Sequence, residues 1–345
     1  MKTSALCPCQ NVRRTCQFVM TNNKNQQHVT IQEQQLDALA KKIAADNRNA
    51  TEWDSDGWHY TGVNYQGPEE LRKERVALYI LALDAINFCF WPHPTLESNT
   101  LEYDHLAIAL RKLAEKDDHG NNNAMSLESY FFQPNNLASL TVKDMEAALD
   151  PLLGHFLPNI EERCRLWNEL GEGLLQSSDE GTAMKFINNN ESSASNLVKA
   201  LVDTFPGFRD ETIWQGRFVA FYKRAQIAVG DLNATLVLNN IPGLDQLTTF
   251  ADYRVPQILR HWGALSYSQP LAQKVDAREE LQLEEEVSIR AATVVCVDEL
   301  VRIVARDSEE TVTAVSMDWY LWQVGESLNQ KGDLKPHHRV NTIFY

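Results

Sequence analysis

Apolar residues recur every three or four positions through most of this 345-residue chain, and that spacing limits the fold to a mostly α architecture. Pro68 marks the start of one strong helix, because proline fits a first helical turn and Glu69 and Glu70 follow near the positive end of the helix dipole. Thr141 and Asp144 have the spacing of a helix cap. The spacing predicts helices over residues 31–45, 68–90, 101–116, 160–176, 194–205, 255–265, 284–305 and 311–328, and another from residue 222 onward.

One short segment departs from the helical spacing. β-Branched and aromatic residues flank Gln215-Gly216 within residues 212–221, which predicts a short β-hairpin. No internal repeat or long low-complexity tract is visible, so we expect a single compact domain over residues 28–345. Residues 1–27 are polar and end in a run of Asn, Lys and Gln, which predicts a flexible N-terminal lead-in.

Charge and hydropathy narrow the possible partners. The chain carries 47 acidic and 32 basic residues, a net charge of −15, whereas tight binding to a long nucleic acid needs clustered Lys and Arg. A single nucleotide remains compatible with this charge, because its phosphate needs one or two cations. No apolar run approaches the roughly 18–20 residues that span a membrane, and residues 1–20 lack the pattern of a secretory signal. We therefore expect a cytoplasmic protein, with the nucleus as an alternative, that makes no membrane contact. We further expect a monomer.

The six cysteines do not indicate a metal site. Cys7, Cys9 and Cys16 are close in sequence, but no C-x-x-C pair occurs and no histidine lies nearby. The others, Cys89 and Cys164 among them, stand in apolar or helical surroundings and are expected to be small buried side chains.

One carboxylate stands on an otherwise apolar and aromatic helix face near the end of the chain. In the segment 315–323, Val315, Asp318 and Trp322 fall at i, i+3 and i+7 and so share one side of a helix. Desolvating a carboxylate is costly, so Asp318 either pairs with a cation, such as Arg290 or Arg339, or lines a pocket. A pocket with an anion beside flat aromatic walls suits a planar, cationic ligand or a reaction that passes through a cation.

Two further segments carry charges at helix starts. Lys223 and Arg224 follow a predicted strand and open a helix, where a phosphate is readily held; the alternative is a solvated surface pair. Asp252 precedes Pro256 at the approach to another helix, where capping is the alternative to a role in a site. His59 lies in a Trp- and Tyr-rich loop, where it could contact a base or be structural.

Several separated motifs, taken together, resemble the queuosine salvage protein family, the queuosine 5′-phosphate N-glycosidases. The matches run in order from about residue 31 to the last residue, and residues 1–27 and 117–123 fall outside them. The motifs are DAINFCFW at 84–91, FPGFRD at 205–210, FYKRAQI at 221–227, FADYRVP at 250–256, DWYLWQ at 318–323 and the ending PHHRVNTIFY at 336–345.

The resemblance implies a helical fold related to the helical DNA glycosylases and hydrolysis of queuosine 5′-monophosphate to release queuine for reinsertion into tRNA. It implies no metal and no cofactor. Asp318 matches the catalytic carboxylate, and Asp252 is expected to be a second catalytic residue. The expected substrate contacts are His59, Lys223, Tyr253, Arg254, Trp322, Gln323 and Glu326, with Lys223 assigned to the 5′-phosphate.

Two other functions stay open at this stage. A non-catalytic carrier of queuine or queuosine would use the same Asp318 face, and release of the free base separates it from an enzyme. A DNA-repair glycosylase is disfavoured by the acidic charge balance. The same balance predicts a free mononucleotide as substrate rather than intact tRNA.

Overall fold

The computed structural model describes residues 7–22, 28–45, 53, 57–91, 101–116, 118, 126–154, 157–177, 181–235, 237–238, 240–307 and 312–345. Over these residues the chain is mostly helical, with two short antiparallel strand pairs, which confirms the predicted α architecture. The sequence also predicts a loop over residues 47–56, which lie outside the described residues apart from residue 53. The helices are α1 (Pro8–Asn22), α2 (Glu33–Ala45), α3 (Glu69–Ile86), α4 (Tyr103–Glu115), α5 (Pro134–Ser139), α6 (Val142–Leu153), α7 (Ile160–Ser177), α8 (Ala183–Asn190), α9 (Ala194–Thr204), α10 (Lys223–Ala234), α11 (Arg254–His261), α12 (Gln269–Asp276), α13 (Leu283–Asp307) and α14 (Ala314–Gln330).

Local signals set several of these boundaries. Thr141 and Asp144 form the predicted capping box at the start of α6, with Thr141 N 2.9 Å from Asp144 Oδ2. Strands β2 (Glu211–Trp214) and β3 (Arg217–Ala220) form the predicted hairpin. Gln215 and Gly216 both have positive φ, 47° and 73°, as a two-residue hairpin turn requires.

Three expectations about the elements need correction. Residues 8–22 are not a flexible lead-in, because α1 buries Val12, Cys16 and Val19 against the core and packs on α13. The helix that begins at residue 69 stops at Ile86, four residues early. The one predicted over 255–265 ends at His261, since the chain turns at Gly263 (φ 74°) and then forms strand β4 (Leu265–Tyr267), which pairs with β1 (Val29–Ile31).

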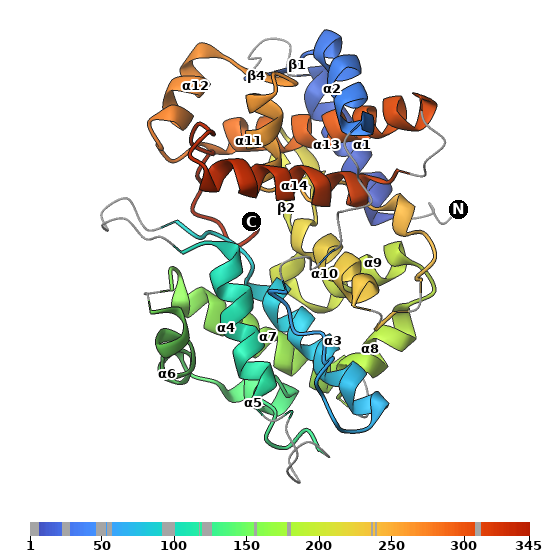
Figure 1. Ribbon diagram of the computed structural model, residues 1–345, viewed down its shortest axis with the longest axis vertical. Coiled ribbons are helices and arrows are strands. Elements are labelled where there is room, and N and C mark those ends of the chain that lie inside the picture. The colour runs from blue at the N-terminus through green and yellow to red at the C-terminus, as the bar shows by residue number, and fades with distance from the viewer. Residues whose placement is uncertain are drawn as a thin grey trace.

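The described core consists of two hydrophobic clusters that meet near α14. One cluster is built mainly on α3–α10 and α1, and the other on α2, α11, α13 and α14. Figure 1 shows α14 crossing the molecule between the two groups of helices, with α10 directly beneath it. This junction positions the site described below.

The C-terminal residues dock into the core. Tyr345 is fully buried, and its backbone oxygen accepts a hydrogen bond of 2.9 Å from Cys89 N. His338 Nε2 lies 3.2 Å from the Tyr345 hydroxyl. Cys89, Cys164 and Cys296 are buried thiols, as expected. Of the helices described, none is long and apolar enough to cross a membrane.

Candidate active site

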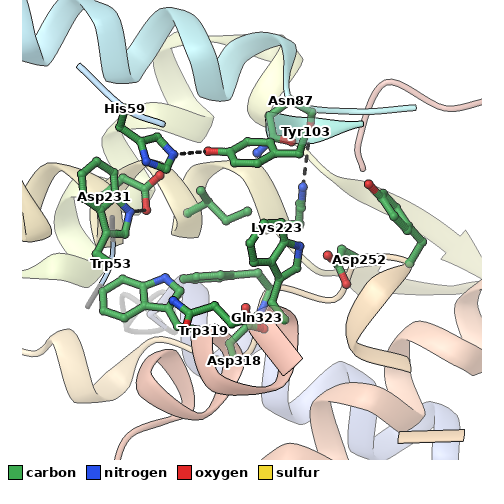
Figure 2. Close-up of a pocket in the computed structure, with 14 residues that line it drawn as sticks. Trp53, His59, Asn87, Tyr103, Lys223, Asp231, Asp252, Asp318, Trp319 and Gln323 are labelled. Carbon is green, nitrogen blue, oxygen red and sulfur yellow. Dashed lines mark hydrogen bonds between the residues drawn. The ribbon is translucent and has the colours of Figure 1, made fainter. Parts of the chain in front are cut away.

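A pocket opens where the two clusters meet, and α10, α14 and the approach to α11 supply most of its wall (Figure 2). The described lining combines five indole or phenol rings with three carboxylates and one ammonium. The lining residues are Trp53, His59, Asn87, Tyr103, Lys223, Ile227, Asp231, Phe250, Asp252, Tyr253, Asp318, Trp319, Trp322 and Gln323.

Asp318 lies in this pocket and not in an arginine pair. Its side chain is 3% exposed, and its Oδ1 accepts hydrogen bonds from the Thr249 hydroxyl and, at 2.8 Å, from Phe250 N. Arg290, one of the partners considered for it, is instead bound to Asp210 at 2.6 Å. Both bonds hold Oδ1 and leave Oδ2 unused by either donor, so the carboxylate has one fixed orientation.

Burial makes the Asp318 carboxylate a poorly solvated anion. Desolvation, followed by the nearby charge of Asp252, raises the pKa of Asp318 well above its ordinary value, while the hydrogen bonds and Lys223 act in the opposite direction. An anion of this kind gains most when positive charge forms beside it. The environment therefore favours a reaction that builds a cation.

Asp252 caps a helix and lines the pocket at the same time. Its Oδ1 accepts bonds of 2.9 Å from the backbone nitrogens of Arg254 and Val255, which is the capping role. Desolvation raises the pKa of Asp252, and the charge of Lys223 opposes that rise. Capping orients the carboxylate toward the pocket, so the two interpretations of this residue are compatible.

Lys223 is a buried lysine among carboxylates. It is 4% exposed, and its Nζ lies 3.4 Å from the backbone oxygen of Asn87, on the side of the pocket that faces Asp252 (Figure 2). Burial lowers the pKa of Lys223 to about 8, although the charges of Asp252 and Asp84 oppose the fall. The ammonium thus lies in the pocket wall with most of its hydration removed.

Arg224 does not act with Lys223 in a phosphate site. It is 1% exposed and donates to backbone oxygens of Asp84, Ala85 and Gly207, away from the pocket lining. The expected cation pair is therefore wrong, because successive residues of a helix point about 100° apart. The alternative of a solvated surface pair is wrong as well, since both side chains are buried.

Aromatic side chains form the wall opposite Asp252. His59 stacks on Trp53 with ring centroids 4.3 Å apart, and its Nε2 lies 2.7 Å from the Tyr103 hydroxyl. Trp322 meets Tyr103 edge to face at 5.6 Å. His59, Trp322 and Gln323, which the resemblance predicts to contact the substrate, thus all line this pocket.

Tyr253 lines the pocket, but Arg254 and Glu326 do not. Arg254 is fully buried and binds Glu326 Oε1 at 2.7 Å and Gln257 Oε1 at 2.6 Å. Burial raises the pKa of Glu326 to about 7, and the charge of Arg254 limits the rise. The ion pair joins α11 to α14. Both side chains were expected to contact the substrate, but neither lines the pocket.

Sequence reasoning missed half of the lining. Asn87, Ile227, Asp231, Phe250, Trp319, Trp53 and Tyr103 were not singled out. For Ile227 and Asp231 a signal existed, since both follow Lys223 at steps of four and so share its helix face. Among the described residues no group of His, Cys, Asp and Glu is arranged to hold a metal ion.

Comparison with known proteins identifies the family of this chain. A family model described as queuosine salvage protein matches residues 68–345. A protein from Dictyostelium discoideum named queuosine 5′-phosphate N-glycosylase/hydrolase is 34% identical, with 98% of this chain and 99% of that protein aligned, so the similarity extends into residues 1–27. Proteins of the same name from Sphaerobacter thermophilus and Nematostella vectensis are 38% and 29% identical, covering 79% and 81% of this chain and 82% and 84% of theirs. The chain belongs to the queuosine salvage protein family.

Proposed function

We propose that this protein hydrolyses the N-glycosidic bond of queuosine 5′-monophosphate and releases queuine for return to tRNA. The observation that carries the proposal is the Asp318 carboxylate, held in one orientation inside an aromatic pocket where burial leaves it poorly solvated. The names of the relatives support the same substrate and reaction.

The reaction builds positive charge on the sugar. When the bond between C1′ and the base nitrogen breaks, the electron pair leaves with the base, and C1′ becomes cationic. Asp318 next to C1′ stabilises that charge more than it stabilises the neutral substrate, which is the condition for catalysis. A water molecule then adds its oxygen to C1′, and the products are queuine and ribose 5-phosphate.

Asp252 fits the role of the base that activates this water. A desolvated carboxylate binds protons more tightly, and burial raises the pKa of Asp252 above its ordinary value. Its Oδ1 is occupied by two backbone amides, so Oδ2 is the oxygen expected to take the proton. The proton is passed on to the departing base, which balances the reaction.

The leaving group needs polar contacts along its edge. Queuine is a 7-deazaguanine and lacks the ring nitrogen that purine hydrolases usually protonate. Gln323 offers a neutral donor and acceptor in the pocket, and the rings of Trp319 and Trp322 offer stacking surfaces.

The proposed substrate is the free mononucleotide. A base within a polymer is reached by gripping the flanking phosphates, which requires several cations and depends strongly on salt. Among the described lining residues Lys223 alone is a lysine or arginine, and it can serve one terminal phosphate. Intact, nuclease-free tRNA should release queuine far more slowly than the mononucleotide, and moderate salt should change the mononucleotide rate little. Comparable release from intact tRNA would overturn this part of the proposal.

Incubation with queuosine 5′-monophosphate tests the reaction itself. Free queuine measured by mass spectrometry should rise with time and with enzyme concentration. A carrier would instead return the nucleotide unchanged after denaturation of the protein, and that result would refute the proposal.

A further inference from the structure

One face of α10 runs the length of the pocket and carries opposite charges at its two ends. Lys223, Ile227 and Asp231 line the pocket at successive steps of four residues. At about 1.5 Å per residue, the eight residues from Lys223 to Asp231 span roughly 12 Å. The face therefore presents a cation, an apolar middle and an anion in that order.

Asp231 is placed where an anion is costly. It is 3% exposed and lies in the last turn of α10, where the helix already presents the negative end of its dipole. Another buried carboxyl is close, since burial and then the charge of Asp231 raise the pKa of Asp84. Asp231 therefore adds negative charge to its end of the pocket, opposite in sign to the Lys223 ammonium on the same helix face.

The surroundings of Asp231 are aromatic. Its Oδ1 accepts a hydrogen bond of 2.8 Å from Trp53 Nε1, and Trp53 stacks on His59. Figure 2 shows the Asp231 carboxylate beside both rings at the end of the pocket away from Asp252. Ring faces attract organic cations, so a ligand cation at this end of the pocket would meet a carboxylate flanked by aromatic rings.

We propose that Asp231 binds the secondary ammonium on the side chain of the queuine base, so that α10 fixes the direction in which the substrate lies. This inference rests on the proposed function. The substrate carries a phosphate at one end and the ammonium at the other, with the ribose and the bicyclic base between them. With the phosphate toward Lys223 and the ammonium at Asp231, the glycosidic bond lies between the two ends of α10, on the side where Asp318 enters the pocket.

The test measures binding of two free bases to the full-length protein. Queuine carries the ammonium, whereas 7-cyano-7-deazaguanine has the same ring system and no positive charge. Asp231→Asn keeps the oxygen that accepts from Trp53 and removes the charge. It should weaken queuine binding by about ten- to hundredfold, the usual loss for a charge-assisted hydrogen bond. The Kd of the neutral base should change by no more than about twofold. Equal weakening of both bases, or of neither, would overturn the proposal.

Two further variants separate charge from structure. Asp231→Glu restores the charge and should restore much of the preference for queuine. Trp53→Phe keeps a ring against His59 but removes the N–H donor, so the preference should persist; its complete loss would mean that Asp231 serves to hold Trp53, against the proposal. A parallel assay of the wild type with queuosine 5′-monophosphate distinguishes failure of the proposed reaction from failure of the role proposed for Asp231. Absence of queuine release would refute the reaction, whereas the binding of the two bases alone tests Asp231.

Discussion

Two buried charge clusters in this molecule are built on opposite principles. Behind the pocket, Arg290 binds Asp210 through both terminal nitrogens, at 2.9 Å and 2.6 Å, and the charges of Asp210 and Glu286 hold the pKa of Arg290 above its usual range despite burial. In the pocket the carboxylates outnumber the one ammonium, and burial raises the pKa of Asp318 and lowers that of Lys223. The first cluster thus stabilises the charged form of Arg290, whereas the second disfavours the charged forms of Asp318 and Lys223.

This difference distinguishes structure from function. A buried pair in which each charge is matched can be replaced or kept with little consequence for chemistry, but removing one partner leaves an uncompensated ion. A cluster with unbalanced charge costs stability in the free protein and is retained where a ligand or transition state completes it. Substitutions in the two clusters should therefore change different properties.

The largest effect on activity is expected at Asp318. Asp318→Asn keeps the shape and removes the charge that stabilises the sugar cation, so the rate of queuine release should fall by roughly 10³-fold or more. The free energy of unfolding should stay the same or rise, because a poorly solvated carboxylate has been removed. Near-normal queuine release by a folded variant would remove Asp318 from the mechanism.

The opposite result is expected at Arg290. Arg290→Met leaves Asp210 buried without its cation, which should lower the free energy of unfolding by about 3–5 kcal/mol. Denaturant unfolding measures this loss. Arg302→Met is the matched control, because Arg302 pairs with Glu299 on the surface of α13 and its loss should barely change stability. If the two variants were equally stable, the matched cluster would not be a structural element.

Lys223 has two possible tasks, and one comparison of substrates separates them. If Lys223 binds the 5′-phosphate, Lys223→Ala should weaken the interaction with the nucleotide by roughly 1.5–3 kcal/mol. The interaction with the nucleoside should stay almost unchanged. If Lys223 balances Asp252 and Asp84, both substrates should lose equally. We expect the first outcome, measured as kcat/KM on the two substrates.

The pH profile gives the smallest but most diagnostic effect. Burial lowers the pKa of Lys223 to about 8; the charges of Asp252 and Asp84 raise it, and those of Arg224 and Arg290 lower it. We therefore expect kcat/KM to fall as pH rises through about 8 and the ammonium is lost. On the acid side, the rate should fall as Asp318 is protonated, at a pH above the ordinary range of an aspartate because its pKa is raised. Lys223→Ala should lack the alkaline fall. A wild-type profile that stays level from pH 7 to 10 would contradict the assignment.

Local patterns predicted most of the helices but not the contacts that join distant segments. The capping box at Thr141 and the Gln215-Gly216 turn are encoded within a few residues, so the sequence reveals them. Strands β1 and β4 have three residues each and form by pairing across more than two hundred positions. In α1 the apolar residues Val12, Cys16 and Val19 have helical spacing, but polar neighbours obscured it.

The site was predictable where one residue type is unusual in its setting. Asp318 stands out because a carboxylate on an aromatic helix face is costly to desolvate unless a partner or ligand compensates it. Lys223 and Asp252 stand out because they lie at helix starts. Arg254 and Glu326, which the resemblance assigned to substrate contact, instead bind each other. Trp53 and Asp231 are 178 positions apart, and only the fold brings them together.

The most direct test of the central claim is a product balance with the wild-type enzyme. Queuosine 5′-monophosphate is incubated in water enriched in ¹⁸O, and queuine and ribose 5-phosphate are both quantified by mass spectrometry. Equal amounts of the two products are expected, with the heavy oxygen in the sugar phosphate and none in queuine. Nucleotide that is bound and recovered intact, with neither product formed, would contradict it.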